Sequence, residues 1–343
     1  MNISVSEKVN SEVPQIVDKT IEKKASDPKI SVHIAYGFHD REEDFKDPKE
    51  RIKTADIYIP EGVGWTPGIL NTLKRVSKGE IDPGLLGKEK FEPSVLETAN
   101  LIYNTNVPIA FVDIPLIHYR YLLILKELIE RGINLKFGPD SFKDNIVLVR
   151  KRLVSSASQQ EKREKFMARR IKPAVKRLLQ EHPHLKDKNE LRVLMSLGSG
   201  HTNLFLSLDD KDFKVTRSFN YLPIVFGSDT EARRRYIFGK EVDNRLIARV
   251  CLEAILQARY PGIKTISSNT EQYYKFIRKV SSQFSFEEIK SMFEEVSTLY
   301  EFPKVLLREL HKKGIYIPES QEEMDAFLAR PISRLSHPSD NAS

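Results

Sequence analysis

Hydrophobic and polar positions along this chain form two alternating patterns. Short apolar runs rich in β-branched and aromatic residues are typical of buried strands. The strands predicted in this way are 30–36, 55–60, 107–114, 191–197 and 213–220. Between them, apolar residues recur at the helical spacing, and the helices predicted in this way are 94–104, 115–131 and 159–181. The alternation predicts an α/β fold over 30–228, with a mixed or mostly parallel central sheet flanked by helices.

Two places in this pattern are less regular. The stretch 146–154 fits a strand or a helix equally well. Pro173 lies inside the helix predicted at 159–181, and we expect it to kink or split that helix because proline removes a backbone donor.

From residue 229 onward the pattern is almost entirely helical. Amphipathic runs occupy 229–260, 270–283, 285–300 and 303–313. Ser285 and Ser320 are each followed three residues later by a glutamate, the spacing of a helix capping box. We therefore predict a helical region over 229–332 packed on the α/β core. Residues 1–29 are predicted to be a partly ordered arm, and 333–343 a disordered tail.

Composition narrows the class of protein. The chain has 343 residues, of which 40% are hydrophobic and 30% charged, as in an ordinary soluble globular protein. No apolar run approaches the roughly 18–20 residues of a membrane span. The N-terminus lacks the apolar segment of a secretory signal. A single cysteine, Cys251, excludes an internal disulfide, and its apolar surroundings predict a buried structural thiol. A cytoplasmic location is the resulting expectation.

The formal net charge of +7 is a modest excess for this length. Basic residues concentrate at 161–179 and at Arg233–Arg235. Neither segment has the interleaved aromatic residues of a single-strand binder. We interpret both as solvated helix faces, so a nucleic-acid partner is not expected.

The strand predicted at 191–197 leads into the most informative stretch of the chain. It breaks at Gly198-Ser199-Gly200, and His201 follows. Open α/β sheets place their ligand sites at such strand ends. The stretch is not a dinucleotide or phosphate-binding loop, because the required third glycine and the Lys-Ser or Lys-Thr pair are absent. Nor is it a nucleophile elbow, which would need glycine on both sides of Ser199 at a spacing of two. Two interpretations of His201 remain. It belongs to a functional site at the strand end, or it caps a turn and has no other role.

Two further strand ends carry polar side chains of the same kind. His39 follows the first predicted strand, and Glu61 follows the second. Parallel strands bring their carboxyl ends to one edge of a sheet, so His39, Glu61 and His201 are candidates for one shared site. Two imidazoles and a carboxylate can bind a divalent metal that activates water. Without metal, a carboxylate oriented by histidine can act as general base. Spacing alone does not choose between these mechanisms.

The order of these motifs resembles a known family. The pieces that carry the resemblance are Gly37-Phe38-His39, Ile59-Pro60-Glu61, Arg163-Glu164-Lys165-Phe166-Met167 and Gly198-Ser199-Gly200-His201. Over about 30–225 the chain resembles the group that contains erythromycin esterases, ChaN-type haem-binding lipoproteins, TraB pheromone-shutdown proteins and Tiki proteases.

The chain also departs from that family. Tyr36 stands where members have a glycine before the first histidine, and no arginine follows Glu61 in GVGWTPG. Glu42 and Glu43 are both candidates for a second acidic residue near His39.

The resemblance implies a hydrolase of esterase or metallopeptidase type that acts on an unknown small-molecule or peptide substrate. Glu61 would activate water with His39 and His201, directly or through a divalent metal held by the three. The alternative is a non-catalytic haem- or ligand-binding or regulatory protein on the same fold, with His39 or His201 as an axial haem ligand.

The shared site makes a geometric prediction. Glu61, His39 and His201 should lie within about 8 Å of one another, a separation that one metal or one bridging water could span. Trp65 or Phe38 should form part of the apolar wall of a pocket there. Outside this site, Asp113 is interpreted as the cap of the following helix, and His33 as a packed or hydrogen-bonded histidine inside a strand.

Overall fold

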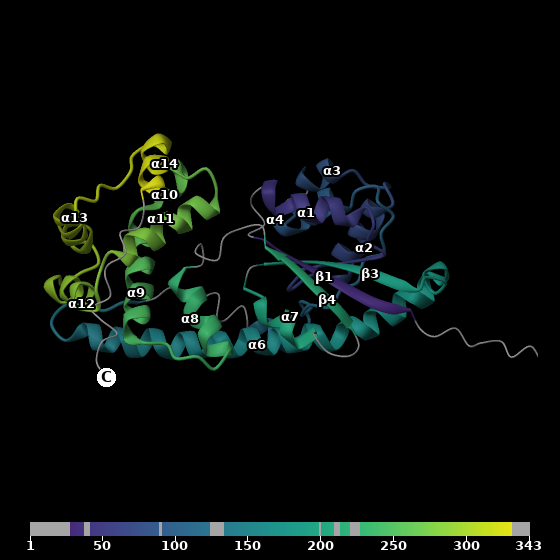
Figure 1. The fold of residues 1–343 in the computed structure, drawn as a ribbon, viewed down its shortest axis with the longest axis horizontal. Coiled ribbons are helices and arrows are strands. Elements are labelled where there is room, and N and C mark those ends of the chain that lie inside the picture. The colour runs from purple at the N-terminus through teal and green to yellow at the C-terminus, as the bar shows by residue number, and fades with distance from the viewer. Residues whose placement is uncertain are drawn as a thin grey trace, which may run out of the picture.

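The computed structural model describes residues 28–37, 42–88, 91–123, 134–198, 200–208, 213–219 and 227–330. The predicted arm, apart from its last two residues, and the predicted tail lie outside these ranges. So do His39, Phe38 and Ser199. The described elements form an α/β region and a helical region, and one long helix runs along both (Figure 1).

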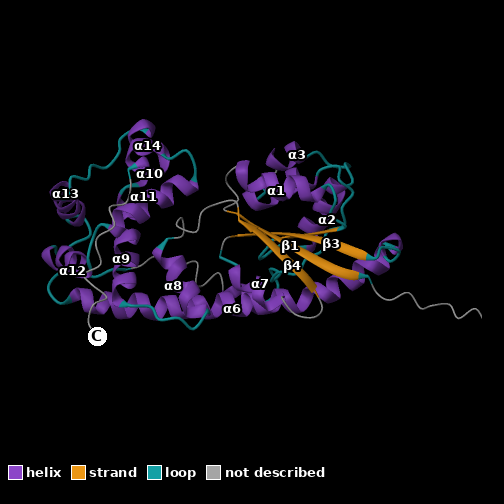
Figure 2. Cartoon of the chain, in the orientation of Figure 1, coloured by secondary structure: helices purple, strands orange, loops and turns teal. Residues whose placement is uncertain are grey.

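A sheet of four parallel strands forms the centre of the α/β region (Figure 2). The strands are β1 (Lys29–Gly37), β2 (Ile57–Pro60), β3 (Glu190–Gly198) and β4 (Phe213–Phe219), in the order β2-β3-β1-β4. β1 and β3 pair in register from Lys29 opposite Glu190 to Gly37 opposite Gly198. The α/β prediction is confirmed, and the parallel pairing brings the carboxyl ends of the strands to one edge.

The predicted strand at 107–114 does not form a full ladder. It contributes one parallel bridge, between Ile109 and Tyr58. The amide of Tyr58 donates to the carbonyl of Pro108, and the amide of Ala110 donates to the carbonyl of Tyr58. Proline has no amide hydrogen to continue such a ladder, and the stretch is otherwise buried in an irregular conformation.

Helices cover both faces of the sheet, and β2 and the carboxyl halves of β1 and β3 are mostly buried. Alternate residues of β1, among them Val32 and Ile34, pack against α6 (Ser141–Glu181) and α7 (Thr202–Leu208). On the opposite face, Ala35 packs in a core that includes residues of the first four helices. These are α1 (Glu42–Ile52), α2 (Pro67–Ser77), α3 (Pro83–Lys88) and α4 (Pro93–Ile102).

α6 is a single helix of 41 residues. It includes the ambiguous stretch 146–154 and continues through Pro173 to Glu181, where a short 3-10 turn (Pro183–Leu185) follows. Beyond the proline, Val175 and Leu178 are buried in the sheet core. This burial holds the last turns in place despite the lost backbone hydrogen bond.

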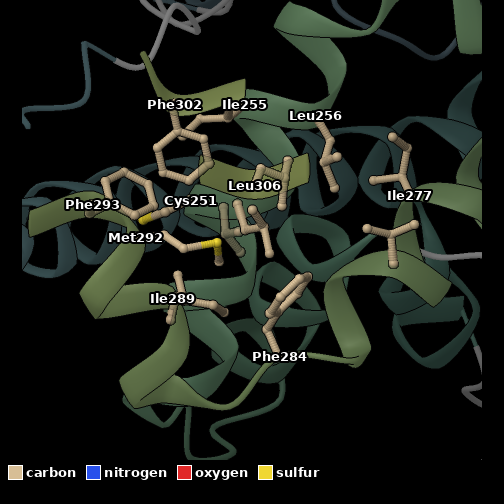
Figure 3. Close-up of a cluster of buried hydrophobic side chains, with 14 of the residues drawn as sticks. Cys251, Ile255, Leu256, Ile277, Phe284, Ile289, Met292, Phe293, Phe302 and Leu306 are labelled. Carbon is tan, nitrogen blue, oxygen red and sulfur yellow. The ribbon is translucent and has the colours of Figure 1, made fainter. Parts of the chain in front are cut away.

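The helical region consists of α8 to α14. Their bounds are α8 (Ser228–Ile237), α9 (Asn244–Arg259), α10 (Pro261–Ile266), α11 (Thr270–Ser282), α12 (Phe286–Glu295), α13 (Phe302–Lys312) and α14 (Gln321–Ala329). Its core surrounds Cys251, Phe293 and Phe302 (Figure 3). Among the described residues, this core draws on Phe142 and Leu153 of α6 and on no residue of the four strands. The region therefore packs on the first half of α6.

Capping residues define several of these helices. Ser285 and Glu288 form the predicted capping box at the start of α12. Ser320 accepts from the amide of Glu323, but Glu323 bonds the amide of Glu319, so the second predicted box is only half formed. Within the part of the chain that the structure describes, no helix is long and apolar enough to cross a lipid bilayer.

Replacing Ile34 by alanine should destabilise the fold substantially. Ile34 is fully buried in the central strand β1, so Ile34→Ala removes apolar contacts and leaves a cavity, at a cost of about 2–5 kcal/mol. Ile30→Ala is the matched control, since Ile30 lies on the same strand but is only partly buried. Urea unfolding should show a clearly smaller loss for the control, and equal losses would contradict this packing.

Candidate functional site

The ends of β2 and β3 bring Glu61 and His201 into contact. The amide of Glu61 donates to the carbonyl of Ser196, 3.0 Å away, which extends the parallel ladder by one residue. The Nε2 atom of His201 lies 3.1 Å from Oε1 of Glu61. The amide of Gly198 donates to Oε2 of the same carboxylate. The two side chains therefore meet at the carboxyl edge of the sheet, where strand-end reasoning predicts them.

A buried arginine holds the other side of Glu61. Arg163, on α6, donates from Nη2 to Oε1 of Glu61 at 2.9 Å. The same guanidinium makes a two-pronged contact with Asp113, including Nε to Oδ1 at 2.9 Å. Such paired contacts fix the arginine plane as well as its charge.

The interpretation of Asp113 as a helix cap is wrong. Its side chain is fully buried and pairs with Arg163. It also accepts from the amides of Gly62 and Ile114, its own neighbour. These contacts join the irregular stretch 107–114 to α6 and to the turn after β2.

A second carboxylate lies behind His201. The Nδ1 atom of His201 is 3.5 Å from Oε1 of Glu164, which is fully buried on α6. The amide nitrogen Nε2 of Gln160 lies 3.0 Å from the same ring atom and 2.9 Å from Glu164. Because the amide nitrogen of Gln160 is a donor, its contact with Nδ1 is a hydrogen bond only in the neutral ring; in the protonated ring Nδ1 donates to Glu164 instead. The hydroxyl of Tyr36 bonds the backbone carbonyl of His201, which further restrains the residue.

These charges raise the pKa of His201. Burial of the ring acts to lower its pKa, and the charge of Arg163 acts in the same direction. The charge of Glu61, with hydrogen bonds to Glu164 and Glu61, outweighs both and raises the pKa of His201 to about 9. The ring is therefore a cation at neutral pH, with Nε2 donating to Glu61 and Nδ1 to Glu164. The pKa of Arg163 also lies above its ordinary value: burial opposes this, but Asp113 and Glu61 favour the charged guanidinium.

A pocket of about 310 Å³ opens beside this network. Glu61 lines it, and so does Trp65, whose ring is buried and forms an apolar wall. Glu92 and Glu97 also line it, and among the residues that the structure describes its lining includes no lysine, arginine or histidine. Phe38, the other predicted wall residue, lies outside the described residues.

The predicted metal set is represented here by two of its three members. His39 lies outside the described residues, as do the side chains of Glu42 and Glu43. Within the described ranges, no three histidine, cysteine, aspartate or glutamate side chains are arranged to hold a metal ion. Arg163 and His201 already contact the same oxygen of Glu61. A metal ion at that oxygen would compete with both. A metal held jointly by His39, Glu61 and His201 stays a prediction.

Haem ligation by His201 fits the site poorly. Only 3% of its side chain is exposed. Both ring nitrogens face partners, Nε2 toward Glu61 and Nδ1 toward Glu164 and Gln160. An axial bond to iron would require one of these contacts to break and the ring to turn outward.

Comparison of the chain with protein-family models, with curated proteins and with solved structures gives no match. The family resemblance and the activity it implies stay predictions.

Three site residues on α6 have no role in the sequence prediction: Gln160, Arg163 and Glu164. The arginine and glutamate belong to the motif that carries the family resemblance, but only the structure shows what they contact. Their spacing of three and four residues places all three on one helix face. Met167, a buried apolar residue, lies on the same face. Polar residues at helical spacing among buried apolar positions are the sequence signal that indicates such a site.

Removing the arginine should unfold the site. Arg163→Met leaves the fully buried carboxylate of Asp113 without its cation, and breaking a buried pair in this way costs about 3–5 kcal/mol. Asp113→Asn should cost a similar amount. The double variant should be more stable than the sum of the two losses predicts, because neither charge is then left unpaired. Urea unfolding of all four proteins tests this, and strictly additive losses would contradict the pairing.

The histidine should make stability depend on pH. Because the pKa of folded His201 is raised, its stabilising contribution is fully present below the unfolded pKa of 6.5 and is lost as the pH rises through about 9. The difference in unfolding free energy between wild type and His201→Gln should therefore shrink across this range, by on the order of 1–3 kcal/mol. The pKa of His33 is lowered, mainly by burial, so its titration falls at lower pH. A difference that stays constant from pH 6.5 to pH 9 would show that His201 is not the titrating group.

Proposed function

We propose that this protein is a hydrolase in which Glu61 activates a water molecule in the pocket at the ends of β2 and β3. The proposal rests on the difference in exposure between Glu61 and the two cations that contact it. The side chain of Glu61 is 24% exposed and lines the pocket, whereas those of Arg163 and His201 are 11% and 3% exposed. The carboxylate alone of the three faces the space that a substrate would enter.

The contacts behind Glu61 support a role in proton transfer. The guanidinium of Arg163, the imidazolium of His201 and the amide of Gly198 hold both carboxylate oxygens in one orientation. A positioned carboxylate can take a proton from water as the water oxygen attacks a carbonyl carbon. When the bond to the leaving group breaks, the same carboxyl group returns that proton to the departing oxygen or nitrogen. Arg163 and His201 are positioning residues in this scheme, since they act through Glu61.

The lining of the pocket favours some substrates over others. With Glu61, Glu92 and Glu97 at its surface and no cationic side chain among the described residues that line it, it would repel an anionic group. An ester or amide that is neutral or positively charged suits it better. Trp65 offers an apolar surface for the uncharged part of such a substrate.

A ligand-binding protein without turnover is the second candidate. It is favoured by the same contacts, because a carboxylate already bound by three donors is also suited to holding a ligand rigidly. A protein of this kind would be stabilised by neutral or cationic ligands and would cleave none of them.

Replacing the carboxylate by its amide separates these functions. Glu61→Gln keeps the shape of the side chain but removes its basicity, and loss of a general base typically lowers the rate about 10²- to 10⁴-fold. The measurement is kcat/KM on a panel of p-nitrophenyl esters and fluorogenic peptides. Glu295→Gln makes the same chemical change at an exposed ion pair on α12, so it should leave kcat/KM unchanged.

Two results would count against the hydrolase. If Glu61→Gln has the same kcat/KM as the wild type on every substrate that is cleaved, Glu61 is not the general base. No cleavage by the wild type, together with thermal stabilisation by uncleaved ligands of the panel, would favour the second candidate.

A further inference from the structure

A second pocket lies on the same face of the sheet, farther from the carboxyl edge. It has a volume of about 180 Å³. Its walls come from the first halves of β1 and β4, from β3 and from the end of α1. The polar residues that line it are Ser31, His33, Arg51, Thr54, Arg192, Lys214 and Thr216. The strand register explains this gathering, because Ser31 lies opposite both Arg192 and Lys214.

We propose that this pocket binds a small phosphate-bearing molecule through Arg51, Arg192 and Lys214. The three cations come from three different elements, α1, β3 and β4, and converge on one space. Within the described ranges, no aspartate or glutamate lines it. The inference goes beyond the proposed hydrolase and does not depend on it.

The carboxylate contacts described for the two arginines leave their terminal nitrogens available to an anion. Arg51 contacts Asp47 through Nε, at 2.6 Å. Arg192 approaches Asp56 through Nε, at 3.6 Å. In both residues the described contacts therefore use the inner nitrogen, and the fork of terminal nitrogens is the part that grips phosphate oxygens best.

The third cation has no carboxylate near it among the described residues. Lys214 is exposed on β4, and no ion pair involves it within the described ranges.

On the neighbouring strand, His33 bonds Thr216 through Nδ1 at 2.8 Å, while its Nε2 is 3.2 Å from Asp47. Burial and the charge of Arg51 lower the pKa of His33, against the opposing effect of Asp47. The positive charge of Arg51 therefore disfavours protonation of His33.

Size and shape favour a small ligand over a nucleic acid. The volume of about 180 Å³ corresponds to roughly six water molecules. That is room for a phosphoryl group and a short organic portion. Nucleic-acid sites that tolerate any sequence present an extended basic groove with aromatic rings for stacking. Among the residues described, the imidazole of His33 is the one aromatic ring that lines this pocket.

α1 lies between this pocket and the candidate hydrolase site. Pro48 of α1 lines the acidic pocket beside Glu61, and Arg51, almost one turn later, lines the basic one. The two pockets thus carry opposite charge on one face of the sheet. A phosphate group is repelled from the first and attracted to the second, so binding here can be measured without interference from the other site.

The test is calorimetric titration of the full chain with inorganic phosphate and with glycerol 3-phosphate at low salt. Tighter binding of the monoester would identify an organic phosphate as the ligand, and equal binding would identify the free ion. The double variant Arg192→Gln/Lys214→Gln should weaken binding by at least about tenfold for each cation removed, as expected for charge-assisted hydrogen bonds.

The matched control is Lys290→Gln/Lys312→Gln, which removes the same charge from α12 and α13 in the helical region. It should bind phosphate as the wild type does. Equal weakening in both double variants would show only a general effect of net charge and would overturn the site. Unchanged binding in the pocket variant, or no binding by the wild type at millimolar phosphate, would also overturn it. If the double variant fails to fold, Lys214→Glu at its exposed position gives the same comparison.

Discussion

The contact between Arg163 and its two carboxylates is the interaction on which the site depends. Asp113 is fully buried, and its charge is tolerated in the interior because the guanidinium pairs with it in a planar, two-pronged contact. The same guanidinium reaches Glu61 after β2. It therefore ties the irregular stretch 107–114, the edge of the sheet and α6 together. Such buried pairs add little net stability because their desolvation is costly, but here the pair determines where Glu61 points.

α6 connects this site to the rest of the protein. Its second half covers the sheet and carries Gln160, Arg163 and Glu164, while Phe142 and Leu153 of its first half belong to the core of the helical region. The helical region therefore shares one helix with the residues that hold Glu61, although its own core contains none of the site residues among those the structure describes.

Electrostatics divides one face of the sheet into two environments. At the carboxyl edge, glutamates surround a pocket walled by Trp65. On the other side of α1, Arg51, Arg192 and Lys214 gather around a smaller space. The alternation of side chains along β1 places Ala35 in the first and His33 in the second, only two residues apart. A short helix laid across a parallel sheet is sufficient to separate environments of opposite charge.

The sequence by itself determined the elements whose pattern is local. The apolar runs of β1 and β3 and the glycines that end them predict strands of one mixed or mostly parallel sheet. The strand-end rule then predicts that Glu61 and His201 share a site, whereas the strand order comes from the structure alone. Only the tertiary structure decided which helix face meets that edge. Arg163 lies 50 residues from Asp113 and 102 from Glu61 in the sequence. Helical periodicity shows which residues share a face, but not which partner the face packs against. The stretch 107–114 likewise has the composition of a strand. Its packing and the missing amide hydrogen of Pro108 limit it to a single bridge.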